Sequence, residues 1–229
     1  MTGSKISIGN KAALNINQNG RTFYHDAAAD TVVILDFETT GLSPDNGDRG
    51  IEIGAVKIEH GQVVARFQEL MYPGQRISSF IESYTGITNK MLSEARPCAD
   101  VMHDFSEFIQ GFNLVAHNAS FDKRFLDAEF SRLSLGYSGD FSCSMLAARR
   151  LCQNSPNYQL GSLVSHLNIP TEGTFHRALY DSEMTAKLWL ALLNNIEEQY
   201  GLSTIPFKLM KKLTKTPRRG VHELFKGEF

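Results

Sequence analysis

The sequence predicts a layered α/β fold with a mixed β-sheet. Residues 32–35 form a short apolar run rich in β-branched side chains, which indicates a strand buried on both faces. Residues 51–59 and 62–72 have the pattern of two further strands, and the tight turn at His60-Gly61 predicts that they form a hairpin. Beyond residue 97, helical and strand patterns alternate. The first part therefore adds a hairpin to one strand, and the rest supplies helices and further strands.

The composition is that of one ordinary domain with extensions. Of the 229 residues, 42% are hydrophobic and 10% aromatic, which is enough to bury a core. The formal net charge of −2 means that a polyanion would be bound through local basic patches or metal ions. Three cysteines without CxxC spacing argue against a disulfide framework or a zinc site. With neither a signal-peptide pattern nor a long apolar run in the sequence, we expect a cytoplasmic protein that makes no membrane contact.

Two carboxylates follow the first predicted strand. Asp36 and Glu38 occupy alternate positions, so they project to the same side of the sheet, roughly 6.5 Å apart at Cα. Side by side at the end of an apolar strand, they repel each other and resist desolvation, which predicts raised pKa values, hydrogen-bond partners or a bound cation. Hard divalent ions such as Mg²⁺ prefer oxygen ligands of this kind. From this stretch alone, two interpretations remain open: a metal site, or a strand that simply ends in polar surface residues.

The segments on either side of this strand are polar. Residues 1–30 predict a loosely held N-terminal extension, with Phe23 and Tyr24 as its packing residues. Residues 43–50 predict a turn-rich loop. Glu52 lies inside the first hairpin strand, where it is either a further ligand or, as we favour, an acid paired within the sheet.

Short helical turns are expected over residues 78–95, and Pro97 leads into a helix over 100–110 with Val101, Phe105, Phe108 and Ile109 on one face. Residues 113–116 predict a buried strand.

A helix from 119 to about 135 follows this strand, with Asn118 as its N-cap. Asp122 lies in its first turn, with Phe125 and Leu126 as its i+3 and i+4 neighbours, so it faces the core. Stabilisation by the helix dipole would explain an acid at this position, but such acids usually lie on the solvated face. The inward direction therefore favours a functional role for Asp122.

The last long helix is expected to run to about Tyr200, after a short strand and helix over 141–151 and a helix over 158–167. Asp181 extends the apolar stripe of this helix backwards by one turn and therefore faces the core, whereas Glu183 faces water. His176, five residues before Asp181, reaches the same pocket only from the loop that precedes the helix. An ordinary solvated loop histidine is the alternative. The stripe comprises Met184, Leu188, Leu192 and Ile196, with Trp189 beside it.

Four inward-facing acids on three elements carry negative charge that a protein core does not tolerate unless it is neutralised. A divalent metal ion would neutralise it. The segments that carry them resemble the DEDDh-type 3′→5′ exonucleases, which include the proofreading (epsilon) subunit of bacterial DNA polymerase III. The resemblance covers about residues 31–195. Position 177 is arginine, where the related tyrosine branch would have tyrosine. The motifs are Asp36-Phe-Glu38-Thr-Thr-Gly41, Ile51-Glu-Ile-Gly-Ala-Val56, His117-Asn-Ala-Ser-Phe-Asp122 and His176-Arg-Ala-Leu-Tyr-Asp181.

The resemblance implies a ribonuclease H-like fold for residues 31–200, with a mixed central sheet and helices on both faces. It implies two Mg²⁺ (or Mn²⁺) ions, one held by Asp36, Glu38 and Asp181, and a second bridged by Asp36 and supported by Asp122. His176 would act as the general base. The terminal nucleotide would be held by Phe37, Thr39, Thr40, Gly41 and Leu42.

The expected activity is metal-dependent 3′→5′ hydrolysis of single-stranded DNA that releases nucleoside 5′-monophosphates, in replication or repair, with a DNA polymerase subunit as a candidate partner. Two alternatives stay open: an exoribonuclease of the same fold that trims RNA 3′ ends, and a non-catalytic polymerase-binding module. The basic segment 201–229 carries seven cations and two acids. This segment would bind the nucleic-acid backbone or, as we favour, form a solvated or partner-binding tail.

Overall fold

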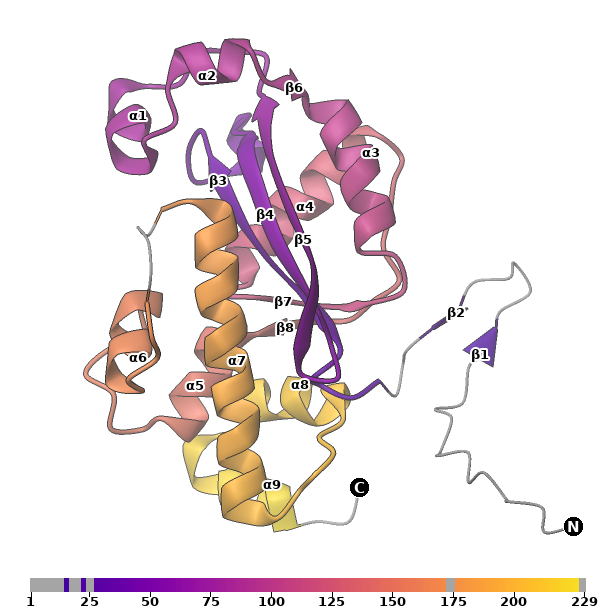
Figure 1. Cartoon of the computed structure of the whole chain (residues 1–229), viewed down its shortest axis with the longest axis vertical. Helices are drawn as coiled ribbons and strands as arrows, with labels where there is room; N and C mark the ends of the chain where they lie inside the picture. Colours follow the sequence, from indigo (N-terminus) through magenta and orange to yellow (C-terminus); the bar gives the residue numbers. More distant parts are fainter. Residues whose placement is uncertain (1–14, 17–21, 24–26, 172–175, 227–229) are drawn as a thin grey trace, which may run out of the picture.

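A six-stranded mixed sheet crosses the molecule, in the strand order β6-β5-β4-β3-β7-β8 (Figure 1). The computed structural model describes residues 15, 16, 22, 23, 27–171 and 176–226. β3, β4 and β5 pair antiparallel in sequence, whereas β7 and β8 run parallel to β3. The mixed sheet of the sequence prediction is therefore confirmed. The strands are β3 (Val32–Thr39), β4 (Gly50–Glu59), β5 (Gln62–Tyr72), β6 (Arg96–Pro97), β7 (Asn113–Ala116) and β8 (Phe141–Cys143), with β1 (Asn15–Ile16) and β2 (Thr22–Phe23) forming a separate ladder.

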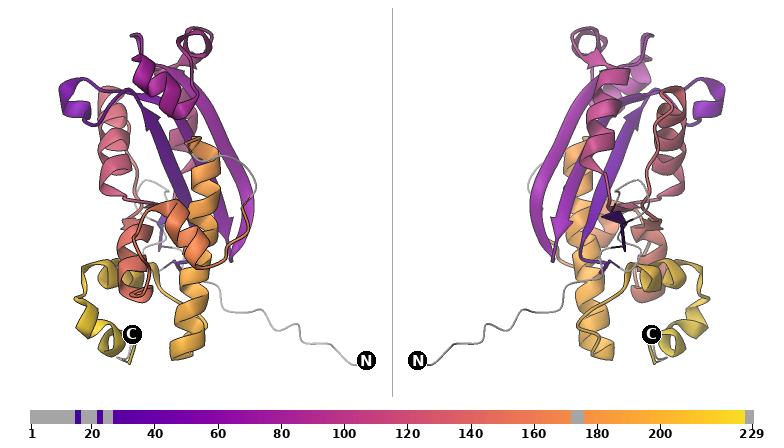
Figure 2. Two further views of the ribbon diagram at one scale, coloured as in Figure 1. Left: turned by 90° about the vertical axis from the view of Figure 1, so that its left-hand side faces the viewer. Right: turned by 90° about the vertical axis from the view of Figure 1, so that its right-hand side faces the viewer.

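Helices cover both faces of the sheet, as expected, and β3 lies between α4 and α7 in the side views (Figure 2). On one face, Val32 and Ile34 belong to the same apolar cluster as Trp189 of α7. On the other, Val33 and Leu35 pack with side chains of α3 and α4. The helices are α1 (Ser79–Thr85), α2 (Asn89–Ser93), α3 (Cys98–Phe108), α4 (Ser120–Arg132), α5 (Ser144–Leu151), α6 (Leu160–His166), α7 (Ala178–Tyr200), α8 (Phe207–Lys215) and α9 (Val221–Lys226), with 3-10 turns at Pro44–Asn46 and Arg218–Gly220.

The alternation of side chains along β3 determines which face receives the two acids. Even-numbered residues of β3 point towards α7, and Asp36 and Glu38 continue that row beyond Ile34. β4 follows the same rule, because Val56 and Ile58 lie on the α7 face, which places Gly54 and Glu52 there as well. The acids of β3 and the first turn of α7 therefore meet on one face of the sheet.

The C-terminal segment differs from the expected solvated tail. Within residues 207–226, two short helices pack into the cluster on the α7 face, and the rings of Phe207 and Trp189 lie 6.3 Å apart. The prediction counted the lysines and arginines but overlooked the helical spacing of the apolar residues between them. These buried residues are Phe207, Leu209, Met210, Leu213, Val221, Leu224 and Phe225.

Three smaller expectations need correction or fall outside the described residues. α4 begins at Ser120 and ends at Arg132, and Asn118 does not cap it, because Asn118 adopts a left-handed conformation with φ 63° before the N-cap residue Ala119. Phe108 is only partly buried. The side chains of Phe23 and Tyr24, on which the predicted packing of the extension depends, lie outside the described part of the chain. Among the described residues, no helix could span a membrane.

Candidate active site

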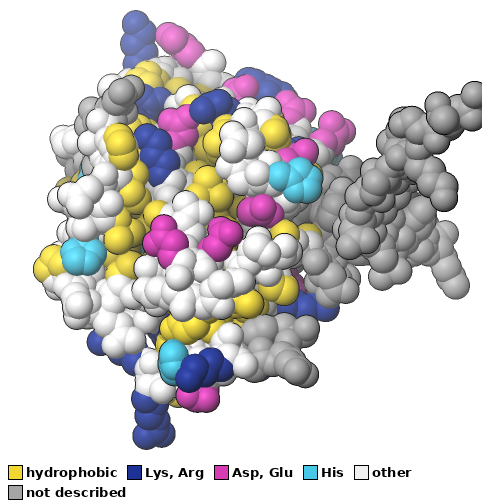
Figure 3. Space-filling model, turned by 60° about the horizontal axis from the view of Figure 1, so that its bottom comes forward, with side chains coloured by type: hydrophobic (Ala, Val, Ile, Leu, Met, Phe, Trp, Pro, Cys, Tyr) yellow, Lys and Arg dark blue, Asp and Glu magenta, His cyan; other side chains and the backbone are white. Residues whose placement is uncertain are grey.

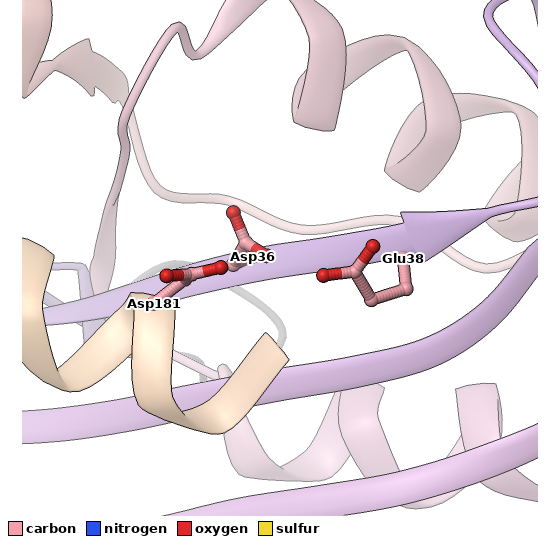
Figure 4. A group of neighbouring side chains, drawn as sticks. All are labelled: Asp36, Glu38 and Asp181. Carbon is pink, nitrogen blue, oxygen red and sulfur yellow. The ribbon is translucent and has the colours of Figure 1, made fainter. Parts of the chain in front are cut away.

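Three carboxylates converge where β3 meets the N-terminus of α7. Asp36 and Glu38 project from β3, and Asp181 projects from the first turn of α7 (Figure 4). One oxygen atom from each carboxylate lies within 4.8 Å of the other two. Glu38 and Asp181 are buried, and Asp36 is partly buried. Side chains that are far apart in the sequence therefore form one acid cluster, here defined as Asp36, Glu38 and Asp181.

The electrostatics of this cluster favour a cation. Burial raises the pKa of Glu38 to about 8, and nearby acids add to the effect. Burial, followed by repulsion from Asp122 and Glu38, raises the pKa of Asp36 well above its usual value. Burial also raises the pKa of Asp181 to about 6, and its buried Oδ1 atom has no hydrogen-bond partner within the described structure. Three oxygen donors with one unsatisfied buried atom are a donor set that suits a hard divalent ion.

Asp122 approaches the same end of β3 from the other side of the sheet. Its side chain is 2% exposed, and its Oδ1 atom accepts a hydrogen bond of 3.1 Å from the backbone N–H of Phe37. Burial raises its pKa to about 7. Asp122 is not one of the three acids whose oxygen atoms lie within 4.8 Å of one another, but its charge raises the pKa of Asp36. The structure thus places three predicted ligands together and the fourth beside them, on the backbone of β3.

Glycine at position 54 allows α7 to approach the sheet. Gly54 pairs directly with Asp36 across the β3–β4 ladder. A Cβ atom at position 54 would lie 2.1 Å from the backbone of Ala178 and Leu179, at the start of α7. The Ser182 hydroxyl of α7 also donates to the carbonyl of Gly54, at 2.9 Å. The absence of a Cβ atom at position 54 therefore allows α7 to place Asp181 close to Asp36.

Glu52 holds the same end of α7 by a buried ion pair. It is fully buried, and its carboxylate accepts from Arg177 Nη2 at 2.8 Å, from the N–H of Ala178 at 3.0 Å and from Gln68 Nε2 at 2.9 Å. Glu52 is a paired acid, as interpreted, but its charged partner Arg177 lies at the start of α7 and not in the sheet, where Gln68 contacts it. Since Glu52 lies opposite Glu38 in the ladder, the Arg177 guanidinium also places a positive charge near the acid cluster.

His176 lies at the mouth of the site, just before α7. It is exposed, with φ 71°, and its backbone N–H donates to Asp181 Oδ2 at 2.9 Å. Its ring centroid lies 4.2 Å from that of Tyr84 on α1. Residues 172–175, immediately before it, are outside the described structure. His176 therefore lies before the start of α7 and lines both cavities at the acid cluster.

Two cavities meet at the acids. A cavity of about 740 Å³ extends over the end of β3 and is lined by the predicted nucleotide-binding segment from Phe37 to Leu42. Thr39 already donates its hydroxyl to the Gly41 carbonyl, and the Phe37 N–H is taken by Asp122. Leu42, which also lines this cavity, is 78% exposed. The second cavity, of about 1070 Å³, runs from Asp36 and Asp181 towards α5 and α6.

Sequence reasoning missed several residues around these cavities. Phe80 and Tyr84 of α1 are 70% and 53% exposed, and their rings stack 5.9 Å apart beside the first cavity. Burial, together with the charges of the acid cluster, raises the pKa of the Tyr84 hydroxyl. Two aromatic residues four positions apart in a segment without a core stripe were the available signal. Arg149 and Tyr158, in the second cavity, had no pattern that would have identified them.

Comparison with known proteins identifies the family of this chain. An exonuclease family model (RNase T) matches residues 33–189. DNA polymerase III of PolC type from Oceanobacillus iheyensis is 38% identical over 184 residues, which is 80% of this chain and 12% of that protein. The corresponding polymerase from Streptococcus thermophilus is 35% identical over 176 residues, 76% of this chain and again 12% of the relative. The chain thus spans only about an eighth of the length of these relatives.

Solved structures give the same result. Exonuclease X in complex with 5′ overhanging duplex DNA superimposes with a TM-score of 0.62 at 28% identity, covering 80% of this chain and 99% of that one. The nuclease domain of 3′hExo, a DEDDh family member bound to rAMP, shares the fold with a TM-score of 0.64 at 20% identity, covering 74% of this chain and 94% of that one. The fold and the family model define a nuclease. More narrowly, the chain belongs to the DEDDh 3′→5′ exonuclease superfamily, with a ribonuclease H-like fold.

Proposed function

We propose that this protein is a divalent-metal-dependent exonuclease that removes nucleotides from the 3′ end of single-stranded DNA and releases nucleoside 5′-monophosphates. The observation that carries the proposal is the acid cluster, whose three oxygen atoms lie within 4.8 Å of one another. The choice of DNA is supported by the PolC-type DNA polymerase relatives and by the likeness to exonuclease X bound to DNA. Because the matched segments belong to polymerases, we also expect a DNA polymerase as partner.

The donor set fits Mg²⁺ or Mn²⁺. Asp36, Glu38 and Asp181 would bind the ions directly, and Asp122 would support them from the Phe37 side. A pair of bound ions would supply a reactive water at neutral pH and stabilise the charge that develops on the leaving 3′ oxygen. The buried Oδ1 of Asp181, which accepts no hydrogen bond from any described residue, is the atom that such an ion would satisfy.

His176 would take the proton from the attacking water. It lies at the mouth of the site, it lines both cavities together with Asp36 and Asp181, and its backbone bond to Asp181 holds it there. The contact with Tyr84 restricts the direction of its ring. An imidazole can accept a proton near neutral pH, which suits a general base.

The terminal nucleotide would enter the cavity over the end of β3. Thr40 and Gly41 line it on one side, and the Leu42 side chain projects from its edge. Phe80 and Tyr84 also line this cavity and provide exposed aromatic surface, on which a base would stack. A phosphodiester at the acid cluster would thus have its last nucleotide in this cavity.

The test is a digestion of matched single-stranded DNA and RNA oligonucleotides, each labelled at its 5′ end. With Mg²⁺ or Mn²⁺ we expect a ladder of shortening DNA products and nucleoside 5′-monophosphates in solution, and no cleavage with a chelator. The Asp181→Asn variant is the matched inactive control. A strong preference for RNA would contradict the DNA assignment, and an uncut oligonucleotide in the presence of metal would favour a non-catalytic binding module.

A further inference from the structure

The second cavity offers a path for the substrate strand away from the acid cluster. It extends for about 1070 Å³ from Asp36 and His176 to Arg149 and Tyr158. His117, at the end of β7, donates from Nε2 to the Tyr158 carbonyl at 2.9 Å and so anchors this wall. If the scissile phosphate lies at the acid cluster and the last nucleotide lies over the end of β3, the second cavity remains for the preceding nucleotides.

Two arginines contact the aromatic ring of Tyr158 at the far end of this path. The guanidinium of Arg149 lies 5.5 Å from the Tyr158 ring centroid, and that of Arg218 lies 5.9 Å from it. Arg218 also donates to the Tyr158 hydroxyl at 3.0 Å. Both arginines are exposed, and neither has a carboxylate partner among the residues that the structure describes. By contrast, five other arginines each form an ion pair with a carboxylate: Arg49, Arg66, Arg96, Arg132 and Arg177.

The C-terminal segment that carries Arg218 is held firmly in place. Arg150 Nε of α5 donates to the Thr216 carbonyl at 3.0 Å, and Leu213 and Val221, on either side, are buried in the cluster on the α7 face. On the face of the molecule that Figure 3 shows, basic, acidic and hydrophobic side chains are interspersed and form no continuous basic field. Arg149 lines the second cavity, and Arg218 lies beside it through its contact with the Tyr158 ring, so a polyanion bound there would meet these two individual cations.

We propose that Arg149 and Arg218, which both contact the Tyr158 ring, bind backbone phosphates of the substrate strand on the 5′ side of the nucleotide being removed. Each guanidinium group is exposed and has no carboxylate partner among the described residues, so a backbone phosphate would supply the neutralising charge. The planar guanidinium also matches phosphate geometry through paired hydrogen bonds. The proposal rests on the exonuclease function and adds the region of the strand that this second site recognises.

A pair of substrates separates this role from catalysis. The p-nitrophenyl ester of thymidine 5′-monophosphate occupies only the acid cluster and the terminal-nucleotide cavity, whereas a single-stranded DNA oligonucleotide also fills the second cavity. For the Arg149→Gln/Arg218→Gln double variant we expect unchanged kcat and KM on the ester. On the oligonucleotide we expect KM to rise on the order of 10-fold, and the slope of log(kcat/KM) against log[salt] to fall by about 1 to 2.

Arg96→Gln is a control for the general effect of losing an exposed arginine, because Arg96 lies in β6 beside α3, on the other side of the molecule from α6 (Figure 1). It should leave both substrates unaffected. A double variant with wild-type KM and salt slope on the oligonucleotide would overturn the proposal while the exonuclease function stands. A wild-type protein that cleaves neither substrate would remove the exonuclease function, and the phosphate site with it.

Discussion

Replacing Gly54 by alanine would place a methyl group between β4 and the start of α7. The added Cβ atom would lie 2.1 Å from the backbone of Ala178 and Leu179, whereas ordinary van der Waals contact begins near 3.4 Å. Because these neighbours are backbone atoms, no side-chain rotation relieves the contact. The first turn of α7 must therefore move away from the sheet by about 1 Å or unwind.

This displacement would act directly on the acid cluster. Asp181 lies in that first turn, and its oxygen atom lies within 4.8 Å of those from Asp36 and Glu38. A shift of about 1 Å in a catalytic group costs on the order of 10²-fold in rate. Overpacking should also lower the free energy of unfolding by about 1 to 3 kcal/mol. We therefore expect Gly54→Ala to reduce kcat at least 10²-fold even in folded protein.

Two further glycines separate loss of stability from loss of the site. Gly139→Ala would bring a Cβ atom within 1.9 Å of the Phe112 carbonyl oxygen, at the opposite end of β7 from the acids, whereas Gly136→Ala meets no atom within 4 Å. We expect Gly139→Ala to lower the melting temperature but retain kcat below it, and Gly136→Ala to change neither. Circular dichroism melting and kcat on a DNA oligonucleotide measure the two effects. A Gly54→Ala protein with wild-type kcat would refute the argument that this glycine sets the position of α7.

Three other predictions concern the acids and His176. The raised pKa values of Glu38, Asp122 and Asp181, about 8, 7 and 6, exceed those of an unfolded chain, so their contribution to stability is complete below about pH 4 and is lost as pH rises through 6 to 8. Thermal melting should therefore show a larger stabilisation by Mn²⁺ at about pH 8 than at about pH 5, and an equal effect at both would contradict it. Asp181→Asn should abolish turnover yet stabilise the metal-free protein at about pH 8 by on the order of 1 to 3 kcal/mol, and unfolding of this variant would show that the acid is structural. His176→Ala should lower kcat by about 10²- to 10⁴-fold without reducing stabilisation by Mn²⁺, whereas full activity would exclude His176 from the mechanism.

The periodicity of the chain was sufficient to predict the direction in which each of these acids faces. Alternation along a strand placed Asp36 and Glu38 on one side, and the helical stripe through Leu188 predicted that Asp181 faces inward while Glu183 faces water. In the structure Glu183 does face outward, where it pairs with Arg66 at 2.6 Å. These features depend on residues close in sequence, so a local pattern contains the necessary information.

Features that depend on contacts between distant elements could not be derived in this way. Gly54 lies in the sequence motif 51–56, but its importance depends on where α7 crosses β4. The partner of Glu52 is 125 residues away. The prediction of Asn118 as a helix cap followed its general preference for that position, whereas its φ of 63° belongs to the turn that leads from β7 into α4. Tertiary packing decided each of these points, and a single sequence does not record it.

The burial of the C-terminal helices has a practical consequence for protein engineering. The exonuclease family model stops at residue 189, in the middle of α7, and the apolar cluster on that face of the sheet continues to Phe225. A fragment trimmed to the family boundary would lose half of its longest helix and expose Trp189, whose indole N–H donates to the Ala29 carbonyl at 2.7 Å. Such a fragment would expose a large apolar surface to solvent and would aggregate. A useful fragment for expression therefore extends beyond residue 225.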